Sequence, residues 1–402
     1  MKDKEIKKLL VAEKKRQKSA VNLIASENYV SKGVLEALGS EFTNKYAEGY
    51  PGKRYYGGNE NSDKLETLCQ ERALKLFGLS GDEWAVNVQP LSGSPANLAV
   101  YLAILPLPNY TLNPSPYTLP KIMGMELSSG GHLTHGHKVS ISGKMWTQIP
   151  YGVKKDSEVL DYEEIKKIAL ENKPAIIVAG YTAYSRIIDF KKFQEIADSI
   201  GAYFMVDMSH FAGLVAGGVY PSPFPYADVV TTTTHKTLRG PRGAIIFTKK
   251  DTRELYKLID KAVFPGIQGG PHLNQIAGVA VALEESTQPK FKKYAEQIVK
   301  NAKVFSEEMK KLGWRIISGG TDTHLFLVDT LNSGARISGK EASDRLEREG
   351  IIVNKNAIPF DTRPPADPSG IRLGTPAQTT RGWKEKDFIK LAGQIDKILR
   401  KE

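Results

Sequence analysis

PAIIVAGYT (174–182), FKKFQEIADSIG (190–201) and AYFMVDMSH (202–210) follow one another in the middle of the 402-residue chain. The first and third are short apolar runs rich in β-branched and aromatic residues, which predicts buried strands, and the second has the spacing of an amphipathic helix. Further strands are predicted at ADVVTTTTHK (227–236) and GAIIFTKK (243–250). This alternation predicts an α/β fold with a large, mainly parallel sheet that helices cover on both faces.

The sequence after about Gln275 predicts a second, smaller α/β unit. Helices are expected there at 296–313, 339–350 and 385–402, with short strands at 314–318 and 323–330. We therefore expect an N-terminal helical arm (1–25), a large domain (26–274) and a small C-terminal domain (275–402). The segment Leu105–Pro120 contains five prolines and is predicted to be a surface loop, longer than a short turn, that could touch a subunit interface.

Composition narrows the class of protein. With 41% apolar and 25% charged residues the chain is typical of globular proteins, and it has no apolar run of the roughly 20 residues that cross a bilayer. The first residues lack the pattern of a secretory signal, and the single Cys69 excludes an intramolecular disulfide, so a cytoplasmic location is expected. The net charge of +11 comes from lysines that acidic residues accompany on helices, which disfavours nucleic-acid binding as the main function.

Polar residues follow four predicted strands at the edge where α/β sheets bind ligands. They are Asp207 and His210 after AYFMV, His235 and Lys236 after VVTTTT, Thr182 and Tyr184 after PAIIVAG, and Leu91 to Ser94 after WAVNVQP. A pyridoxal phosphate site needs a lysine for the Schiff base, an aspartate for the pyridine nitrogen and helix N-terminal amides for the phosphate. Each piece alone could equally be a solvated lysine, a helix cap or a turn, so the residues leave this function as one of several.

Seven stretches together resemble one known family. They are NLIASEN (22–28), NKYAEGYPGKRYYGG (44–58), SSGGHLTHG (128–136), VDMSHFAGLVAGG (206–218), TTTTHKTLRGPRGA (231–244), FPGIQGGP (264–271) and SGIRLGTPAQTTRG (369–382). In order and spacing they resemble the serine hydroxymethyltransferases. The resemblance implies the fold-type I architecture of pyridoxal-phosphate-dependent transferases, like that of aspartate aminotransferase. It also implies reversible transfer of the hydroxymethyl carbon of serine to tetrahydrofolate, which gives glycine and 5,10-methylenetetrahydrofolate.

The resemblance also implies a role for individual residues around the cofactor. Lys236 matches the lysine that bonds to the cofactor, Asp207 the partner of the pyridine nitrogen, and His132 the histidine that stacks on the ring. His210 and Thr182 match groups near the phenolic oxygen, with Thr182 in place of a usual serine. The phosphate cradle corresponds to Ser92, Gly93 and Ser94, completed by Tyr46 and Gly270 of the neighbouring subunit in a homodimer, and whether dimers pair into tetramers stays open.

Substrate roles follow in the same way. Arg372 and Ser26 match the groups that bind the carboxylate of serine, which suits a guanidinium because it forms two parallel hydrogen bonds to a carboxylate. Glu48 matches the carboxyl group that exchanges a proton with substrate and folate, and Tyr55 and Tyr56 match tyrosines beside the substrate. Leu127, Gly131, Leu133 and Asn356 match folate-binding positions.

The chain departs from the family at several positions. Pro364 and Ala366 stand where many members have a serine and an aromatic residue against the folate, which predicts weaker or differently posed folate. Leu91 replaces an aromatic residue or histidine, and Ser209 replaces an alanine. Two alternatives therefore stay open: a folate-independent pyridoxal-phosphate aldolase of β-hydroxy amino acids, and a catalytically silent protein that binds RNA. No metal site is expected.

Overall fold

The chain forms two compact units in the computed structural model, which describes residues 2–106 and 119–401. The large unit is Asn28–Glu296, and the small unit combines Met1–Glu27 with Gln297–Glu402. This division differs from the predicted one at both boundaries. Residues 275–296 stay in the large unit because α10 (Leu273–Ser286) packs against α2 (Lys32–Leu38) and α3 (Glu60–Phe77).

The N-terminal segment belongs to the small unit through β1 (Val21–Asn22), which pairs in parallel with β13 (Ile351–Ile352). The segment also continues beside β15 (Gly370–Gly374), where the amide of Gly374 donates to the carbonyl of Leu23 at 2.8 Å. α1 (Lys4–Ser19) precedes this strand and has no buried residue in the described chain. The predicted N-terminal arm is thus tied to the C-terminal part of the sequence.

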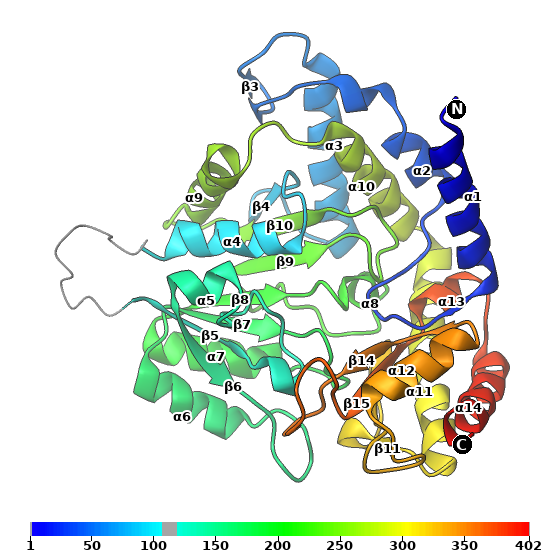
Figure 1. The fold of residues 1–402 in the computed structure, drawn as a ribbon. Coiled ribbons are helices and arrows are strands. Elements are labelled where there is room, and N and C mark those ends of the chain that lie inside the picture. Colours follow the sequence, from blue (N-terminus) through cyan, green and yellow to red (C-terminus); the bar gives the residue numbers. More distant parts are fainter. Residues whose placement is uncertain (1, 107–118, 402) are drawn as a thin grey trace. The chain divides into compact units, whose positions relative to one another are not determined.

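A seven-stranded sheet forms the centre of the large unit (Figure 1). Its strand order is β4 (Trp84–Asn87), β10 (Ala244–Lys249), β9 (Val229–Thr233), β8 (Tyr203–Asp207), β7 (Ile176–Gly180), β5 (Lys121–Met125) and β6 (Thr147–Tyr151). β5 to β9 are parallel, and β10 runs antiparallel to both of its neighbours. The predicted α/β fold with a mainly parallel sheet is confirmed, but the reversed direction of β10 had no signal in the sequence.

Helices cover both faces of this sheet because its side chains alternate between them. Met205 of β8 joins the apolar cluster under α4 (Gly93–Ile104), while its neighbour Phe204 stacks on Phe193 of α7 (Phe190–Ile200) at 5.9 Å between ring centroids. Cys69, a free thiol in α3, is fully buried. Both faces are therefore largely apolar where the helices pack.

The other elements of the large unit are short or lie around the sheet. They are η1 (Glu41–Asn44), β2 (Gly49–Tyr50), β3 (Lys53–Arg54), η2 (Leu127–Ser129), α5 (Ile141–Met145), α6 (Tyr162–Asn172), α8 (Ala212–Ala216), α9 (Leu255–Lys261) and η3 (Ala262–Ile267). β2 and β3 form an antiparallel hairpin. The predicted loop Leu105–Pro120 lies mostly outside the described residues; of its ends, Leu105 caps α4 and is buried.

The small unit has an antiparallel sheet in the order β11 (Arg315–Ile316), β12 (Leu325–Asp329), β15 and β14 (Asn354–Asn356). Its other elements are η4 (Ile317–Gly319), α12 (Gly339–Arg348), α13 (Pro376–Thr380) and α14 (Glu385–Arg400), and it shares α11 (Pro289–Lys311) with the large unit. Phe305, Phe326 and Phe388 meet in its core. Among the described residues, no helix is both long and apolar enough to cross a membrane.

Candidate active site

Asp207 ends β8 and is the centre of a buried polar cluster in the large unit. One carboxylate oxygen, Oδ2, accepts a hydrogen bond from Asn97 Nδ2 at 2.8 Å and one from His135 Nε2 at 3.3 Å. The other, Oδ1, accepts from the amide of Ser209 at 3.0 Å. A carboxylate has about four acceptor sites, so these three bonds fix the group and leave room for one more donor.

The environment of Asp207 keeps its carboxyl group ionised. Burial alone would raise its pKa, but the hydrogen bond from His135 and the charge of Lys236 hold it well below the usual value of 3.8. A fixed negative charge inside the protein is stable only beside donors and cations. Asp207 can therefore stabilise a cation that enters from the ligand side, such as a protonated ring nitrogen.

His132 belongs to the same cluster through a chain of hydrogen bonds. Asn97 Nδ2 donates to Thr134 Oγ1 at 2.9 Å, and Thr134 Oγ1 lies 2.7 Å from His132 Nδ1, which also accepts from the amide of Thr134 at 3.2 Å. Thr231 Oγ1 in turn donates to Asn97 Oδ1 at 2.7 Å. Burial, with the nearby His135 and Lys236, lowers the pKa of His132 from 6.5 to about 4, so its ring is held in place and uncharged at neutral pH.

Lys236 lies three residues beyond the end of β9 and is 9% exposed. Its carbonyl accepts a hydrogen bond from Asn28 Nδ2 at 2.9 Å, which fixes the backbone below the side chain. Its charge acts on both Asp207 and His132, so the three groups lie near one another. Burial, followed by the charge of Lys236, lowers the pKa of the adjacent His235 to about 3, and this imidazole is also neutral.

The N-terminus of α4 lies against the ends of β8 and β9. Ser92 is the residue before the helix, and its side chain makes no capping hydrogen bond, so the first amides of α4 have no side-chain cap. A Cβ on Gly93 would meet Thr233 Cγ2 at 2.8 Å, which leaves glycine as the residue that allows this close approach. Amides at a helix N-terminus that also carries Ser94 suit the phosphate of a ligand.

The turn after β5 carries the predicted stacking and folate residues together. It runs through Leu127 in η2, Gly131, His132 and Leu133, of which Leu133 is exposed. A Cβ on Gly131 would lie 1.9 Å from the carbonyl oxygen of Met125, so the tight turn itself requires this glycine. The amide of Thr182 donates to the carbonyl of Gly130 at 2.7 Å and joins this turn to the end of β7.

His210 follows Asp207 on the same loop and is 2% exposed. Its carbonyl accepts a hydrogen bond from Thr237 Oγ1 at 3.1 Å, and its ring lies 6.4 Å from that of Tyr181. Thr237 follows Lys236 directly. The loops after β8 and β9 are thus bonded to one another through residues adjacent to the predicted catalytic ones.

A second group of predicted residues lies on the loop and hairpin around β2 and β3. Tyr46 donates to Glu48 Oε1 at 3.4 Å, and the rings of Tyr46 and Tyr56 meet edge to face at 5.5 Å between centroids. Tyr46, Tyr55 and Tyr56 are 57%, 74% and 51% exposed. The negative charge of Glu48 raises the pKa of Tyr46.

Gly269 and Gly270 lie against this exposed group. A Cβ on Gly270 would meet Tyr46 Cζ at 3.4 Å, and one on Gly269 would meet Glu48 Oε1 at 3.3 Å. The sequence prediction that Tyr46 and Gly270 act together is consistent with this proximity within one chain. The exposed rings are unusual for a monomer, since aromatic residues carry much of the apolar area that proteins bury.

Arg372 lies in β15 of the small unit and is 5% exposed. Its Nε donates to Asn354 Oδ1 at 3.0 Å, and Asn354 Nδ2 donates to Asn356 Oδ1 at 3.2 Å. Burial lowers the pKa of Arg372 from 12.5 to about 10, which leaves the guanidinium charged at neutral pH. Ser26 follows Ala25, whose Cα lies 2.5 Å from where a Cβ on Gly374 would be, so the segment of Ser26 is packed against β15.

Comparison with known proteins decides the family. A model of the family described as serine hydroxymethyltransferase matches residues 1–395. A serine hydroxymethyltransferase of Koribacter versatilis (strain Ellin345) is 54% identical over 398 residues, which cover 99% of this chain and 89% of the relative. The chain belongs to the serine hydroxymethyltransferase family.

Membership of this family establishes the class of enzyme. Serine hydroxymethyltransferases are fold-type I enzymes that depend on pyridoxal phosphate, use tetrahydrofolate as co-substrate and interconvert serine and glycine. The expected fold and reaction are thereby confirmed. The match supports the transferase and does not support the folate-independent aldolase.

The residues of the large unit fit pyridoxal phosphate as this family requires. Asp207 is ionised and has an acceptor site left for the pyridine nitrogen, Lys236 supplies a primary amine from the next strand, and α4 presents uncapped amides. A Cβ on Gly93 would meet Thr233 Cγ2 at 2.8 Å, so the glycine allows the helix N-terminus to approach the end of β9. The groups that the large unit presents are therefore the ones that the cofactor of this family needs.

The sequence did not point to four residues of this cluster: Asn97, Thr134, His135 and Thr231. Asn97 lies inside α4, and nothing in the neighbouring sequence indicates that this asparagine is buried in a polar cluster. His135 is the second histidine of GGHLTHG, and its spacing from His132 could have marked it. Ser209, an unusual residue for the family, accepts the amide of Thr233 at 3.0 Å through Oγ.

The loop around Pro364 and Ala366 is fixed within the small unit. Asp361 Oδ1 accepts from the amide of Arg363 at 3.0 Å and from Ser369 Oγ at 2.7 Å, and the carbonyl of Ala366 accepts from Lys355 Nζ at 2.6 Å. This loop is therefore well bonded within the small unit. Weaker folate binding stays a prediction.

Proposed function

We propose that the buried cluster of the large unit binds the cofactor and that Asp207 is its electrostatic anchor. Pyridoxal phosphate, when bound, supplies an aldehyde that an amine can join and a ring that accepts electrons from the bond that breaks. The single observation that carries the proposal is the ionised Asp207, held by Asn97 and His135 beside the buried Lys236. In this arrangement Asp207 holds a proton at the pyridine nitrogen.

Lys236 is the proposed nucleophile toward the cofactor aldehyde. Its amine is the primary amine at the end of β9, and the neutral His235 next to it adds no competing charge. The neutral ring of His132 provides a flat face for stacking. His210 and Thr182 are proposed to contact the phenolic oxygen, and the amides and hydroxyls of Ser92, Gly93 and Ser94 to bind the phosphate.

Substrate handling is proposed to fall to two other groups. Arg372 and Ser26 bind the serine carboxylate, because a charged, buried guanidinium forms strong bidentate bonds to it. Glu48 exchanges a proton with the serine hydroxyl and the folate, with Tyr55 and Tyr56 beside the substrate. Leu127, Gly131, Leu133 and Asn356 are proposed to contact the folate.

We further propose that the enzyme is a homodimer with shared active sites, in which Tyr46 and Gly270 complete the phosphate site of the partner. The exposed rings of Tyr46, Tyr55 and Tyr56 support this, since contact with a second copy would bury them. Exposed Leu9, Leu10 and Val11 on α1 are a further apolar surface of the chain. A cytoplasmic location is proposed as well, in keeping with the single free Cys69.

The test combines visible absorption with a serine cleavage assay. The purified protein, mixed with pyridoxal phosphate, should gain a visible absorption band. Borohydride should abolish this band while it fixes the cofactor covalently on Lys236, and Lys236→Ala should show neither the band nor the label. Serine should be converted to glycine rapidly only when tetrahydrofolate is present. Equal rates with and without tetrahydrofolate would contradict the proposed part of folate, and a borohydride label on another lysine would contradict the role of Lys236.

A further inference from the structure

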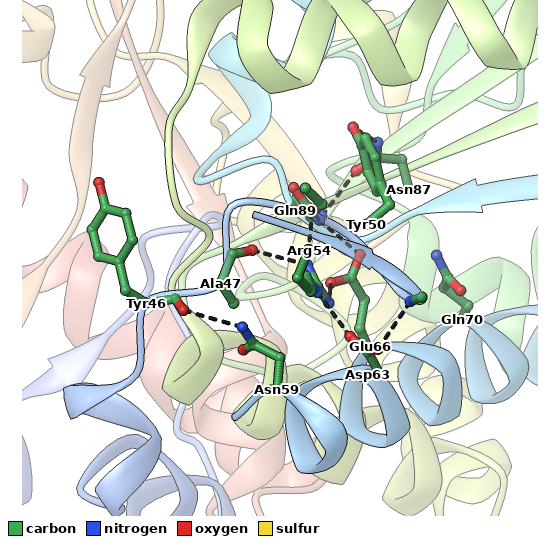
Figure 2. Close-up of polar contacts among 12 residues, drawn as sticks. Tyr46, Ala47, Tyr50, Arg54, Asn59, Asp63, Glu66, Gln70, Asn87 and Gln89 are labelled. Atoms are coloured by element: carbon green, nitrogen blue, oxygen red, sulfur yellow. Dashed lines mark hydrogen bonds and ion pairs between the residues drawn. The ribbon is translucent and has the colours of Figure 1, made fainter. Parts of the chain in front are cut away.

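A buried arginine lies between the exposed loop of Glu48 and helix α3. Arg54 Nη1 donates to the carbonyls of Ala47 at 2.9 Å and Gly49 at 2.7 Å, the two residues on either side of Glu48. The same guanidinium donates to Glu66 Oε2 at 2.6 Å and, through Nε, to Asp63 Oδ1 at 2.8 Å. Figure 2 shows Arg54 between the loop and the two acidic residues of α3.

Gln89 connects this arginine network to the chain that leads to the phosphate cradle. Its Nε2 donates to the carbonyl of Gly49 at 3.0 Å and to Glu66 Oε1 at 2.8 Å. Gln268 then binds the backbone on both sides of Pro90, because its Nε2 donates to the carbonyl of Gln89 at 2.9 Å and its Oε1 accepts from the amide of Leu91 at 3.0 Å. One set of bonds therefore runs from the two residues that flank Glu48 to Leu91, the residue before Ser92.

The network is charged and buried, which is costly if its only purpose is stability. The side chains of Arg54 and Glu66 are 3% and 0% exposed, and burial raises the pKa of Glu66 although Arg54 and Gln89 lower it. Apolar residues of similar volume often stabilise a fold as well as a buried ion pair does. What an apolar pair cannot do is bind the two carbonyls that flank Glu48.

We propose that Arg54, Glu66 and Gln89 are positioning residues that hold the backbone of Ala47–Gly49, so that the Glu48 carboxylate keeps the place its proton transfer requires. The proposal rests on the proposed function of Glu48. The planar guanidinium is essential to it, since only this group reaches two carbonyls and two carboxylates at once; a lysine ammonium has three donors and no fork.

The first experiment measures Arg54→Lys in two ways. In the cofactor-free protein, hydrogen exchange of the peptide covering residues 46–58 should be at least about tenfold faster, because the loop loses its bonds to α3. In the holoenzyme, kcat should fall by about 10- to 100-fold while KM for serine changes less than about threefold, as expected when a reacting group is misplaced. Arg253→Lys is the control: Arg253 also bonds two carboxylates, of Asp228 and Asp251, but at the surface, and neither readout should change.

A second variant covers the case in which Arg54→Lys does not fold. Arg54→Met combined with Glu66→Leu removes both charges and keeps the volume, which usually preserves folding. It should show the same faster exchange and lower kcat. Wild-type exchange or wild-type kcat in the variant that folds would overturn the proposal.

Glu48→Gln separates this inference from the function on which it rests. Full turnover in Glu48→Gln would overturn the proton role of Glu48 and the inference with it. Low turnover in Glu48→Gln together with wild-type kcat in Arg54→Lys would overturn the positioning role alone. Low kcat in both, with faster exchange only in the Arg54 variant, is the expected result.

Discussion

The two groups of polar residues in the large unit differ in how they are held. Asp207, Asn97 and His135 form a buried cluster in which side chains bind one another directly. Tyr46, Tyr55 and Tyr56 are exposed and Glu48 is partly buried, and the loop of Glu48 is held through its backbone by Arg54. The first arrangement fixes charges before any ligand arrives, whereas the second fixes only the chain and leaves the side chains free to meet a substrate or a second subunit.

The largest expected effect tests whether the buried cluster carries the chemistry at all. Lys236→Ala should lower kcat by about 10⁴-fold or more, because removal of a nucleophile leaves only binding and electrostatic contributions. Steady-state conversion of serine to glycine measures it. Loss of less than tenfold would show that another amine bonds to the cofactor.

Matched carboxylate-to-amide changes compare the two groups directly. Asp207→Asn should lower kcat by about 10³-fold and destabilise the protein by about 3 kcal/mol, because the buried network loses a negative charge and one acceptor oxygen becomes an NH2 donor. Glu48→Gln should lower kcat by about 10²-fold yet change stability by less than about 0.5 kcal/mol, since Glu48 is only partly buried and glutamine can still accept the long hydrogen bond from Tyr46. Urea unfolding at pH 7 and kinetics measure both; equal loss of stability would remove the distinction between the groups.

The pH dependence of stability should come from the buried cluster. The pKa of His132 is about 4 in the folded protein and 6.5 ordinarily, so the unfolded chain takes up a proton first as the pH falls. Stability should therefore decrease between pH 6.5 and 4, by on the order of 3 kcal/mol for this group. His132→Gln should remove that part of the slope in urea unfolding, and an unchanged slope would contradict the neutral assignment.

Two glycine substitutions give the smallest effects. Gly93→Ala should cost about 1–3 kcal/mol, because its Cβ would lie 2.8 Å from Thr233 Cγ2 between packed elements. Gly270→Ala should cost less than about 0.5 kcal/mol, since its Cβ would meet the exposed Tyr46 ring at 3.4 Å, an ordinary contact. Thermal unfolding of both variants checks the order, and a larger cost at Gly270 would show that the exposed loop is packed more tightly than its surface suggests.

The sequence by itself determined the strands, the strand ends and the family. β-branched runs predicted β7, β8 and β9 to within a few residues, and Asp207 and Lys236 stand where those runs end. These signals are local, because side-chain alternation and turn residues depend on neighbours in the chain. The long motifs pointed to the family, and the family gives the reaction and the cofactor.

Only the tertiary structure decided which residues hold the site together. Asn97 donates to Asp207, which lies 110 positions further along the chain. Arg54 donates to Glu66 because the β2–β3 hairpin lies on α3. The same holds for the reversed β10 and for the N-terminal strand that pairs with Ile351–Ile352. Such contacts arise from packing between distant segments, which no local pattern of side chains specifies, so the supporting residues became visible only in the folded chain.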